Sequence, residues 1–289
     1  MQYVEPVFRP PSEANSFILQ VTLGCSNNKC TFCAMYRNKK FKIRPFEDIE
    51  EDIKSVAGQL KGVRRIFLAD GDAMVLKPKP LIRILDCLHE HFPNLERVSI
   101  YTDAKGINNK TDEELAELKT RKLDVVYLGL ESGSDKVLKL VRKGVTAEEM
   151  ITAMKRAQAQ GIKTSVIALL GLGGKELSVE HARETARVVS AMEPDYFSAL
   201  TLTLVPGTEL HEQAEAGEFN PLTPEESLEE LHRMIELTRF TKPVIFRTNH
   251  SSNYLALQGT LPGDKKKILD AIKTGLKNKA LRPEWMRGL

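Results

Sequence analysis

The sequence predicts an α/β fold with parallel strands, either a doubly wound sheet or a (βα) barrel. Short β-branched or apolar runs alternate with amphipathic helical stretches along the 289 residues. Such alternation is typical of parallel strands joined by right-handed crossovers. The expected strands are almost continuously apolar, as strands buried on both faces are. Apolar residues make up 42% of the chain, which is long enough to bury a sizeable core.

Seven strands and nine helices are expected from these patterns. The strands span 17–22, 65–69, 97–101, 125–130, 164–170, 197–205 and 244–247. Helical periodicity runs over 46–60, 79–91, 112–121, 135–142, 146–160, 178–191, 209–216, 224–239 and 263–278. Thr146 and Glu149 have the spacing of a capping box, and Thr223 precedes a proline suited to the first helical position. Gly144 and Gly161 stand where helix ends favour a positive φ.

Charge and hydropathy exclude several classes of protein. Lys and Arg exceed Asp and Glu by only three, too few to imply nucleic acid or an anionic membrane by themselves. The longest apolar run, 165–174, is about half of what a membrane span needs, and the first residues do not resemble a signal peptide. We therefore expect a cytoplasmic protein without a membrane partner. A reducing cytoplasm keeps thiols available as metal ligands.

Three of the four cysteines lie within nine residues. Cys25, Cys30 and Cys33 form C-x4-C-x2-C directly after the first expected strand. Three thiolates can hold three irons of a [4Fe–4S] cluster and leave the fourth iron open to a small molecule. Structural zinc requires four ligands, and the next candidates, Cys87 and His89, come more than 50 residues later. A distant ligand that folds back keeps zinc open as the alternative.

A strand, a three-cysteine loop with Phe32 before its last cysteine, and alternating βα units together resemble the radical SAM superfamily over residues 16–216. The usual motif of that family is C-x3-C-x2-C, so this loop has one extra residue. The resemblance implies a partial or full (βα) barrel of the radical SAM, TIM-barrel-like type. It also implies an enzyme whose cofactors are a [4Fe–4S] cluster and S-adenosylmethionine, and it leaves open whether the reaction is that of an oxidoreductase, a lyase or a transferase. Reductive cleavage would give a 5′-deoxyadenosyl radical that takes a hydrogen atom from the substrate.

The same resemblance implies cofactor contacts in the turns that follow the strands. Asp72, after Gly71, would meet the amino group of S-adenosylmethionine, and Glu131 the ribose or the amino group. Arg142 would bind the carboxylate, because a guanidinium fork matches its geometry. The glycine-rich turn at 169–174 would bring backbone close to the adenine. The full set of expected cofactor contacts is Phe32, Tyr36, Gly71, Asp72, Glu131, Ser132, Arg142, Leu170 and Gly171.

Polar residues after two other strands are candidates for substrate binding or catalysis. They are Thr102 and Asp103 after the third strand, and Arg247, Asn249, His250 and Asn253 after the last. His250 suits acid–base chemistry or a substrate contact, although an ordinary polar loop would look the same. The basic segment 37–44 carries five positive charges and could attract an anionic substrate or a reductase such as flavodoxin or ferredoxin. A solvated face is the simpler interpretation of that segment.

The expected organisation is an N-terminal extension (1–15), a barrel core (16–216), a completion of the barrel (217–262) and a basic, solvated helical tail (263–289). Cys87 is expected in the core, and the histidines on helical patterns, His181 among them, are expected at the surface or in packing roles. The favoured substrate is a small or medium-sized molecule, with nucleic acid less favoured. The alternatives are an RNA-modifying enzyme that uses the basic segments 37–44 and 265–282, and a non-catalytic zinc- or iron–sulfur-binding module.

Overall fold

The computed structural model describes residues 3–60 and 62–288, which divide into two compact units. The first unit comprises the chain up to Asn28, Met35–Leu128 and Thr152–Thr164. The second comprises Lys29–Ala34, Gly129–Ile151 and the chain from Ser165 onward. The cysteine loop and strand β6 (Leu123–Glu131) therefore contribute residues to both units.

The first unit is built on parallel strands in the order β1-β4-β5-β6. These are β1 (Phe17–Gln20), β4 (Arg65–Ala69), β5 (Arg97–Thr102) and the first part of β6, with a small antiparallel pair β2 (Thr22–Leu23) and β3 (Lys42–Ile43). Its helical segments are η1 (Pro11–Glu13), α1 (Phe46–Gln59), η2 (Ala73–Val75), α2 (Pro78–His91), α3 (Ala104–Asn108) and α4 (Asp112–Thr120). Helix α6 (Ala147–Ala159) begins in the second unit and ends in the first.

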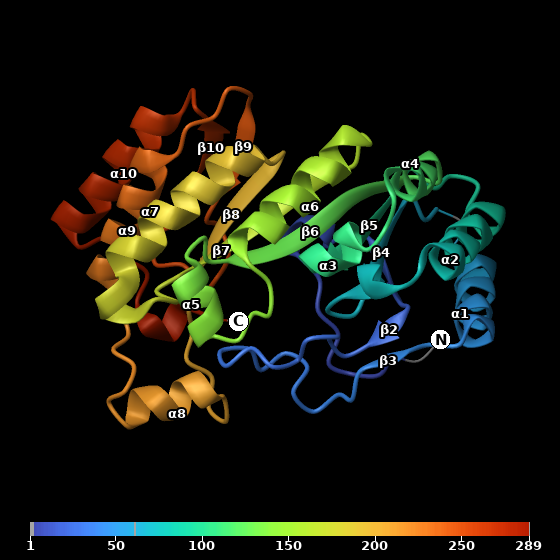
Figure 1. Ribbon diagram of the computed structural model, residues 1–289, viewed down its shortest axis with the longest axis horizontal. Coiled ribbons are helices and arrows are strands. Elements are labelled where there is room, and N and C mark those ends of the chain that lie inside the picture. Colours follow the sequence, from blue (N-terminus) through green and yellow to red (C-terminus); the bar gives the residue numbers. More distant parts are fainter. Residues whose placement is uncertain (1–2, 61, 289) are drawn as a thin grey trace. The chain divides into compact units, whose positions relative to one another are not determined.

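The second unit continues the alternation. Its strands are β7 (Lys163–Leu170), β8 (Tyr196–Thr201), β9 (Val244–Arg247) and β10 (Gln258–Leu261), of which only β10 runs antiparallel to its neighbour. Its helical segments are α5 (Asp135–Leu140), α7 (Gly174–Met192), α8 (Glu209–Glu215), α9 (Pro224–Leu237), α10 (Lys265–Asn278) and η3 (Glu284–Met286). Helix α9 packs against both α7 and α10 (Figure 1).

The strands follow one order, β1-β4-β5-β6-β7-β8-β9-β10, in a mostly parallel sheet. Strands β1 and β10 stand at its two ends, so the described strands form the partial version of the expected (βα) barrel. Two expected strands match their observed bounds, 65–69 and 244–247. The strand expected over 197–205 ends at Thr201, shortly before a Pro206-Gly207 turn. The short strands β3 and β10 were not expected, because neither carries an apolar run.

The helix ends predicted from the sequence are confirmed. Thr146 and Glu149 exchange reciprocal hydrogen bonds. Thr223 forms a full capping box with Glu226, and Pro224 occupies the first helical position. Gly144 and Gly161 both have positive φ, 79° and 74°. Within residues 3–60 and 62–288, no helix is both long enough and apolar enough to cross a membrane.

Candidate active site

The cysteine loop supplies three thiols that form no disulfide. Cys25, Cys30 and Cys33 are each partly exposed, whereas Cys87 is buried in α2, as expected of a core thiol. The backbone N–H of Cys33 donates to the carbonyl of Cys30 at 3.2 Å, so these two cysteines share one tight turn in the second unit. Three accessible thiols on one short loop fit the ligand set of a [4Fe–4S] cluster. Among the described residues, no group of three or more His, Cys, Asp or Glu side chains is arranged so that it could hold a metal ion.

In the first unit, a buried aspartate fixes the start of this loop. Asp70 follows β4 and is fully buried. One of its carboxylate oxygens accepts from the backbone N–H of Gly24 at 3.0 Å and from Lys39 Nζ at 3.1 Å, and the other accepts from Gln20 Nε2 at 3.0 Å. A buried carboxylate is tolerated only when it is bonded in this way. Asp70 therefore holds the residue before Cys25 against the end of β4. An acid directly after a buried strand is the sequence signal that marks this residue.

The basic segment 37–44 is only partly a solvated face. Lys39 is buried and, besides Asp70, donates to the carbonyls of Val4 and Pro6. Arg44 is paired with Asp52 at 2.7 Å. The segment thus presents three exposed cations rather than five, namely Arg37, Lys40 and Lys42.

Gly71 and Asp72 lie against residues of the cysteine loop. A Cβ on Gly71 would stand 2.7 Å from the Tyr36 ring, so only glycine lets this buried ring approach the turn. The Asp72 carboxylate is almost fully buried and accepts from Ser26 Oγ at 2.5 Å and from the backbone N–H of Asp103 at 3.0 Å. Asp72 therefore connects the residue after Cys25 with the end of β5. A carboxylate has further lone pairs with which it can accept a bond from an ammonium group.

Thr102 and Asp103, the expected substrate contacts of the first unit, serve the local fold. Thr102 is buried and its hydroxyl donates to the carbonyl of Asp103 at 2.7 Å. Asp103 caps α3 by accepting from the backbone N–H of Lys105 at 2.9 Å. Their contact with a substrate remains a prediction.

A buried lysine beneath these turns was not expected. Lys110 Nζ donates to the carbonyls of Met74 and Gly106, each at 2.7 Å. The side chain thus ties η2, which follows Asp72, to α3, which follows Asp103. Burial lowers the pKa of Lys110 to about 8, and the charge of Asp72 opposes this shift.

In the second unit, Glu131 and Arg142 both have a left-handed backbone, with φ of 61° and 54°. That conformation is uncommon outside glycine and is often found at functional sites. Glu131 is paired with Lys143 at 3.3 Å, and Arg142 makes two bonds of 2.7 Å to the carboxylate of Glu209. The Arg142 side chain is 59% exposed, so this is a surface ion pair.

Ser132 and Gly171 are held by buried polar groups, and Leu170 is buried at the end of β7. Ser132 Oγ lies 2.8 Å from Nδ1 of His181, and the backbone N–H of Gly171 donates to Glu230 Oε1 at 2.6 Å. Phe32 packs against a small apolar cluster that includes Val141 and Leu210. The cluster connects the cysteine turn with α5 and α8 of the same unit.

The four candidates at the end of β9 and in the loop after it have different surroundings. Arg247 is exposed, and its side chain makes no hydrogen bond or ion pair within the described residues; Asn249 is also exposed. Nδ1 of His250 accepts from the backbone N–H of Ser252 at 3.1 Å, and burial, followed by the charge of Arg282, lowers the pKa of this ring. Asn253 is buried, and its amide group bonds Thr201 and the carbonyls of Ala199 and Thr248. Arg247 and His250 therefore retain capacity for a substrate, whereas Asn253 holds its own loop.

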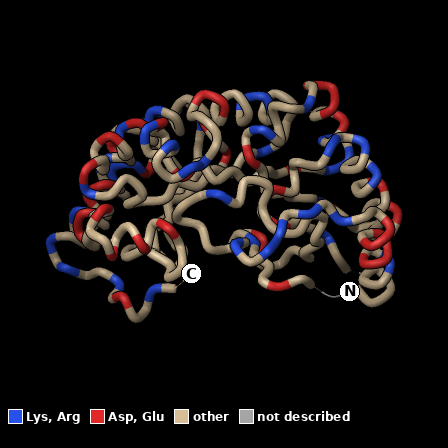
Figure 2. The backbone as a smooth tube through the Cα atoms, turned by 60° about the horizontal axis from the view of Figure 1, so that its bottom comes forward, with Lys and Arg blue, Asp and Glu red and all other residues tan. Residues whose placement is uncertain are grey.

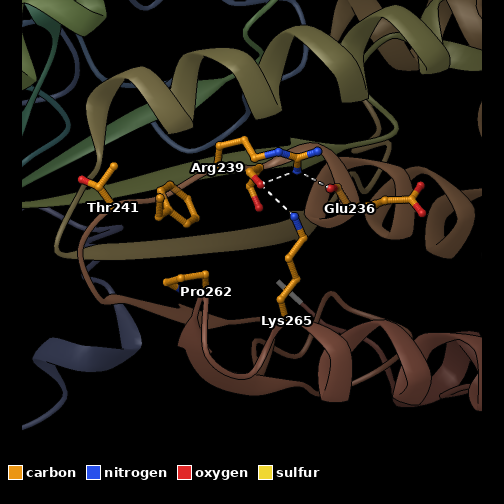
Figure 3. A pocket seen from close by; sticks show the side chains of 7 residues that line it. Glu236, Arg239, Thr241, Pro262 and Lys265 are labelled. Atoms are coloured by element: carbon orange, nitrogen blue, oxygen red, sulfur yellow. Dashed lines mark hydrogen bonds between the residues drawn. The ribbon is translucent and has the colours of Figure 1, made fainter.

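A surface pocket in the second unit lies away from these candidates. It is lined by residues that precede β9, among them Thr238 and Phe240, and by Pro262 and Lys265, which follow β10 (Figure 3). Lys265 Nζ and Arg239 Nη1 both donate to the Thr238 carbonyl at 2.8 Å. The pocket stands at the amino end of β9, whereas functional residues of parallel barrels gather at the carboxyl ends of the strands.

The sequence is similar to a family model and to several known proteins. A family model described as the radical SAM superfamily matches residues 19–189. A putative methylthiotransferase of Methanocaldococcus jannaschii is 33% identical over 164 residues, which cover 53% of this chain and 34% of that protein. A tRNA-2-methylthio-N(6)-dimethylallyladenosine synthase of Bdellovibrio bacteriovorus is 25% identical over 242 residues, covering 81% and 51% respectively.

Solved structures agree on the fold. The Escherichia coli coproporphyrinogen III oxidase, described as a radical SAM enzyme, superimposes with a TM-score of 0.60 and 19% identity. The match covers 76% of this chain and 51% of that one. The chain thus spans about a third to a half of the length of the relatives given above.

Proposed function

Because this chain belongs to the radical SAM superfamily, and is therefore an enzyme that binds a [4Fe–4S] cluster and S-adenosylmethionine, we propose that it abstracts a hydrogen atom from a bound substrate. When bound, these cofactors would supply a one-electron cleavage of the C5′–S bond of S-adenosylmethionine, with the electron coming from an external reductant. The observation that carries the proposal is the loop with three accessible, unbridged thiols. Cys25, Cys30 and Cys33 are the proposed cluster ligands.

Side chains that follow β4 and β6 would orient S-adenosylmethionine. Asp72 would accept from its ammonium group, and the left-handed turns at Glu131 and Arg142 would face its ribose and carboxylate. The Arg142–Glu209 pair is exposed, and such pairs contribute about 0–1 kcal/mol, so a ligand carboxylate could replace Glu209 at small cost. Arg37, Lys40 and Lys42 would attract an acidic electron donor such as flavodoxin or ferredoxin.

The test is anaerobic reconstitution with iron and sulfide, followed by dithionite and S-adenosylmethionine. The wild-type protein should release 5′-deoxyadenosine, and Cys25→Ser, Cys30→Ser and Cys33→Ser should each reduce that release at least a hundredfold. Cys87→Ser is the matched control, because this thiol is buried in α2, and it should retain activity. A reconstituted wild-type protein that forms no 5′-deoxyadenosine would contradict the proposal.

The leading substrate class is a small or medium-sized molecule, and Arg247 is its proposed anchor. Strand β9 alternates buried Val244 and Phe246 with exposed Ile245 and Arg247. The guanidinium of Arg247 is thus available for an anionic group. His250 lies in the following loop, and because its Nδ1 already accepts from the backbone N–H of Ser252, its Nε2 is the nitrogen that would donate a hydrogen bond to the substrate.

RNA is the second candidate, because a relative whose alignment covers 81% of this chain is described as a tRNA-2-methylthio-N(6)-dimethylallyladenosine synthase. Lys and Arg are interspersed with Asp and Glu over most of the chain (Figure 2), so the basic segments 37–44 and 265–282 are the surfaces that an RNA would use. Titration with tRNA at several salt concentrations separates the two classes. An RNA-binding face must lose affinity steeply as salt rises, whereas absence of binding at low salt would leave the small-molecule class.

A further inference from the structure

We propose that a buried pair, His181 and Glu230, acts as a positioning device that holds two cofactor-binding turns in register. The turns are those at Ser132, after β6, and at Gly171, after β7. The inference rests on the proposed function, because it takes these two turns as the cradle for the adenosine part of S-adenosylmethionine. All four residues belong to the second unit.

The histidine end of the pair holds the Ser132 turn. His181 lies on α7, is fully buried, and has Nδ1 at 2.8 Å from Ser132 Oγ. The same hydroxyl oxygen accepts from the backbone N–H of Ser134 at 3.0 Å, which leaves its proton for the imidazole. Helix α7 also binds the residue that follows Ser132, because the backbone N–H of Gly133 donates to Thr185 Oγ1 at 2.9 Å. Helix α7 therefore fixes this turn at consecutive residues.

The glutamate end holds the Gly171 turn. Glu230 lies on α9 and is 1% exposed, an unusual position for a carboxylate. Its Oε1 accepts from the backbone N–H of Gly171 at 2.6 Å, and its Oε2 from Ser178 Oγ at 2.5 Å. Gly171 has a φ of 82°, which a side chain would strain. The carboxylate thus fixes the orientation of one peptide in a conformation suited to glycine.

The two ends meet inside the unit. His181 Nε2 is 3.6 Å from Glu230 Oε1, and this buried nitrogen has no hydrogen-bond partner within the described residues. A ring that accepts from Ser132 at Nδ1 carries its proton on Nε2, which then faces the carboxylate. A buried ionisable pair is a costly way to fill a core, since apolar residues would stabilise the same volume at least as well. What the pair provides is a defined spacing between the Ser132 and Gly171 turns.

Glu230→Gln tests this role, because it keeps the shape and removes the charge. Glu229→Gln on the same helix is the matched control, since that side chain is exposed. We expect the Kd for S-adenosylmethionine of the reconstituted enzyme to rise tenfold or more in Glu230→Gln and to stay unchanged in Glu229→Gln. A folded Glu230→Gln variant with the wild-type Kd would overturn the inference. Wild-type protein that forms no 5′-deoxyadenosine would instead contradict the proposed function itself.

A second variant tests the coupling. His181→Asn places an amide near Ser132, but this shorter side chain cannot reach Glu230, so the variant should raise the Kd for S-adenosylmethionine by a similar factor. If the pair acts as a unit, the Kd of the double variant for S-adenosylmethionine should not exceed that of the weaker-binding single variant. A double variant whose Kd rises by the product of the two single factors would overturn the coupling. The ¹⁵N imidazole signals of His181 in cluster-free protein give a readout independent of activity. They should report the Nε2–H tautomer in the wild type and change in Glu230→Gln, and unchanged signals would also count against the pair.

Discussion

At the scale of single residues, Lys110 shows how burial alone makes a side chain sensitive to pH. Lys110 is 5% exposed, its ammonium donates to two backbone carbonyls, and desolvation lowers its pKa from 10.5 to about 8. The unfolded chain therefore binds more protons at this residue than the folded chain between pH 8 and 10.5. Stability contributed by this site must rise with pH across that window, by at most about 3 kcal/mol.

Comparison with Lys110→Met isolates this effect, because every other titrating group is shared. We expect the free energy of unfolding of the wild type, relative to the variant, to increase as pH rises from 8 toward 10.5. Chemical denaturation at half-unit steps of pH measures the difference. A difference that stays flat over this window would show that Lys110 titrates normally.

At the scale of elements, the cysteine loop depends on one buried ion pair for its starting point. Asp70 and Lys39 lie 3.1 Å apart, and the same carboxylate accepts from the backbone of Gly24. Removing one partner leaves an unpaired buried charge, which typically costs about 3–5 kcal/mol. Lys39→Met should therefore lower the free energy of unfolding by that amount and reduce the iron bound on reconstitution. Lys40→Met, an exposed neighbour, should change both by little; equal behaviour of the two variants would contradict this account.

The elements also show which information is local. Helix bounds and caps followed from neighbouring residues, because Thr223 needs only Glu226 three positions later to form its capping box. The two-residue strand β3 and the exposed strand β10 could not be predicted, since their pairing partners, not their own residues, define them.

At the scale of the whole molecule, the positions of the candidate residues were predictable and their partners were not. Turns after successive strands were expected to matter because parallel strands end at one edge. Which polar groups the fold itself uses depends on contacts distant in sequence. Asn253 is occupied by Thr201, and His181, expected only at the surface or in packing, instead bonds Ser132. No local pattern distinguishes these side chains from Arg247, which stays exposed.

In the basic tail too, some charged side chains bond within the fold and others are exposed. Arg282 donates to the carbonyls of His250, Ser251 and Asn253, and Arg287 donates to Ser252 and lies 4.1 Å from the Tyr254 ring. Both arginines therefore hold the loop after β9, contrary to a solvated tail. The lysines at 277 and 279 are exposed and have no such contacts within the described residues.

Two double variants with the same change in net charge separate these effects. Arg282→Ala with Arg287→Ala should lower the free energy of unfolding by about 3 kcal/mol or more, because hydrogen bonds from charged donors contribute about 1.5–3 kcal/mol each. Lys277→Ala with Lys279→Ala should change it by about 0.5 kcal/mol or less. Limited proteolysis should then cut the loop 249–254 faster only in the arginine variant. If both double variants lose the same stability, net charge rather than contact with the loop determines what the tail contributes.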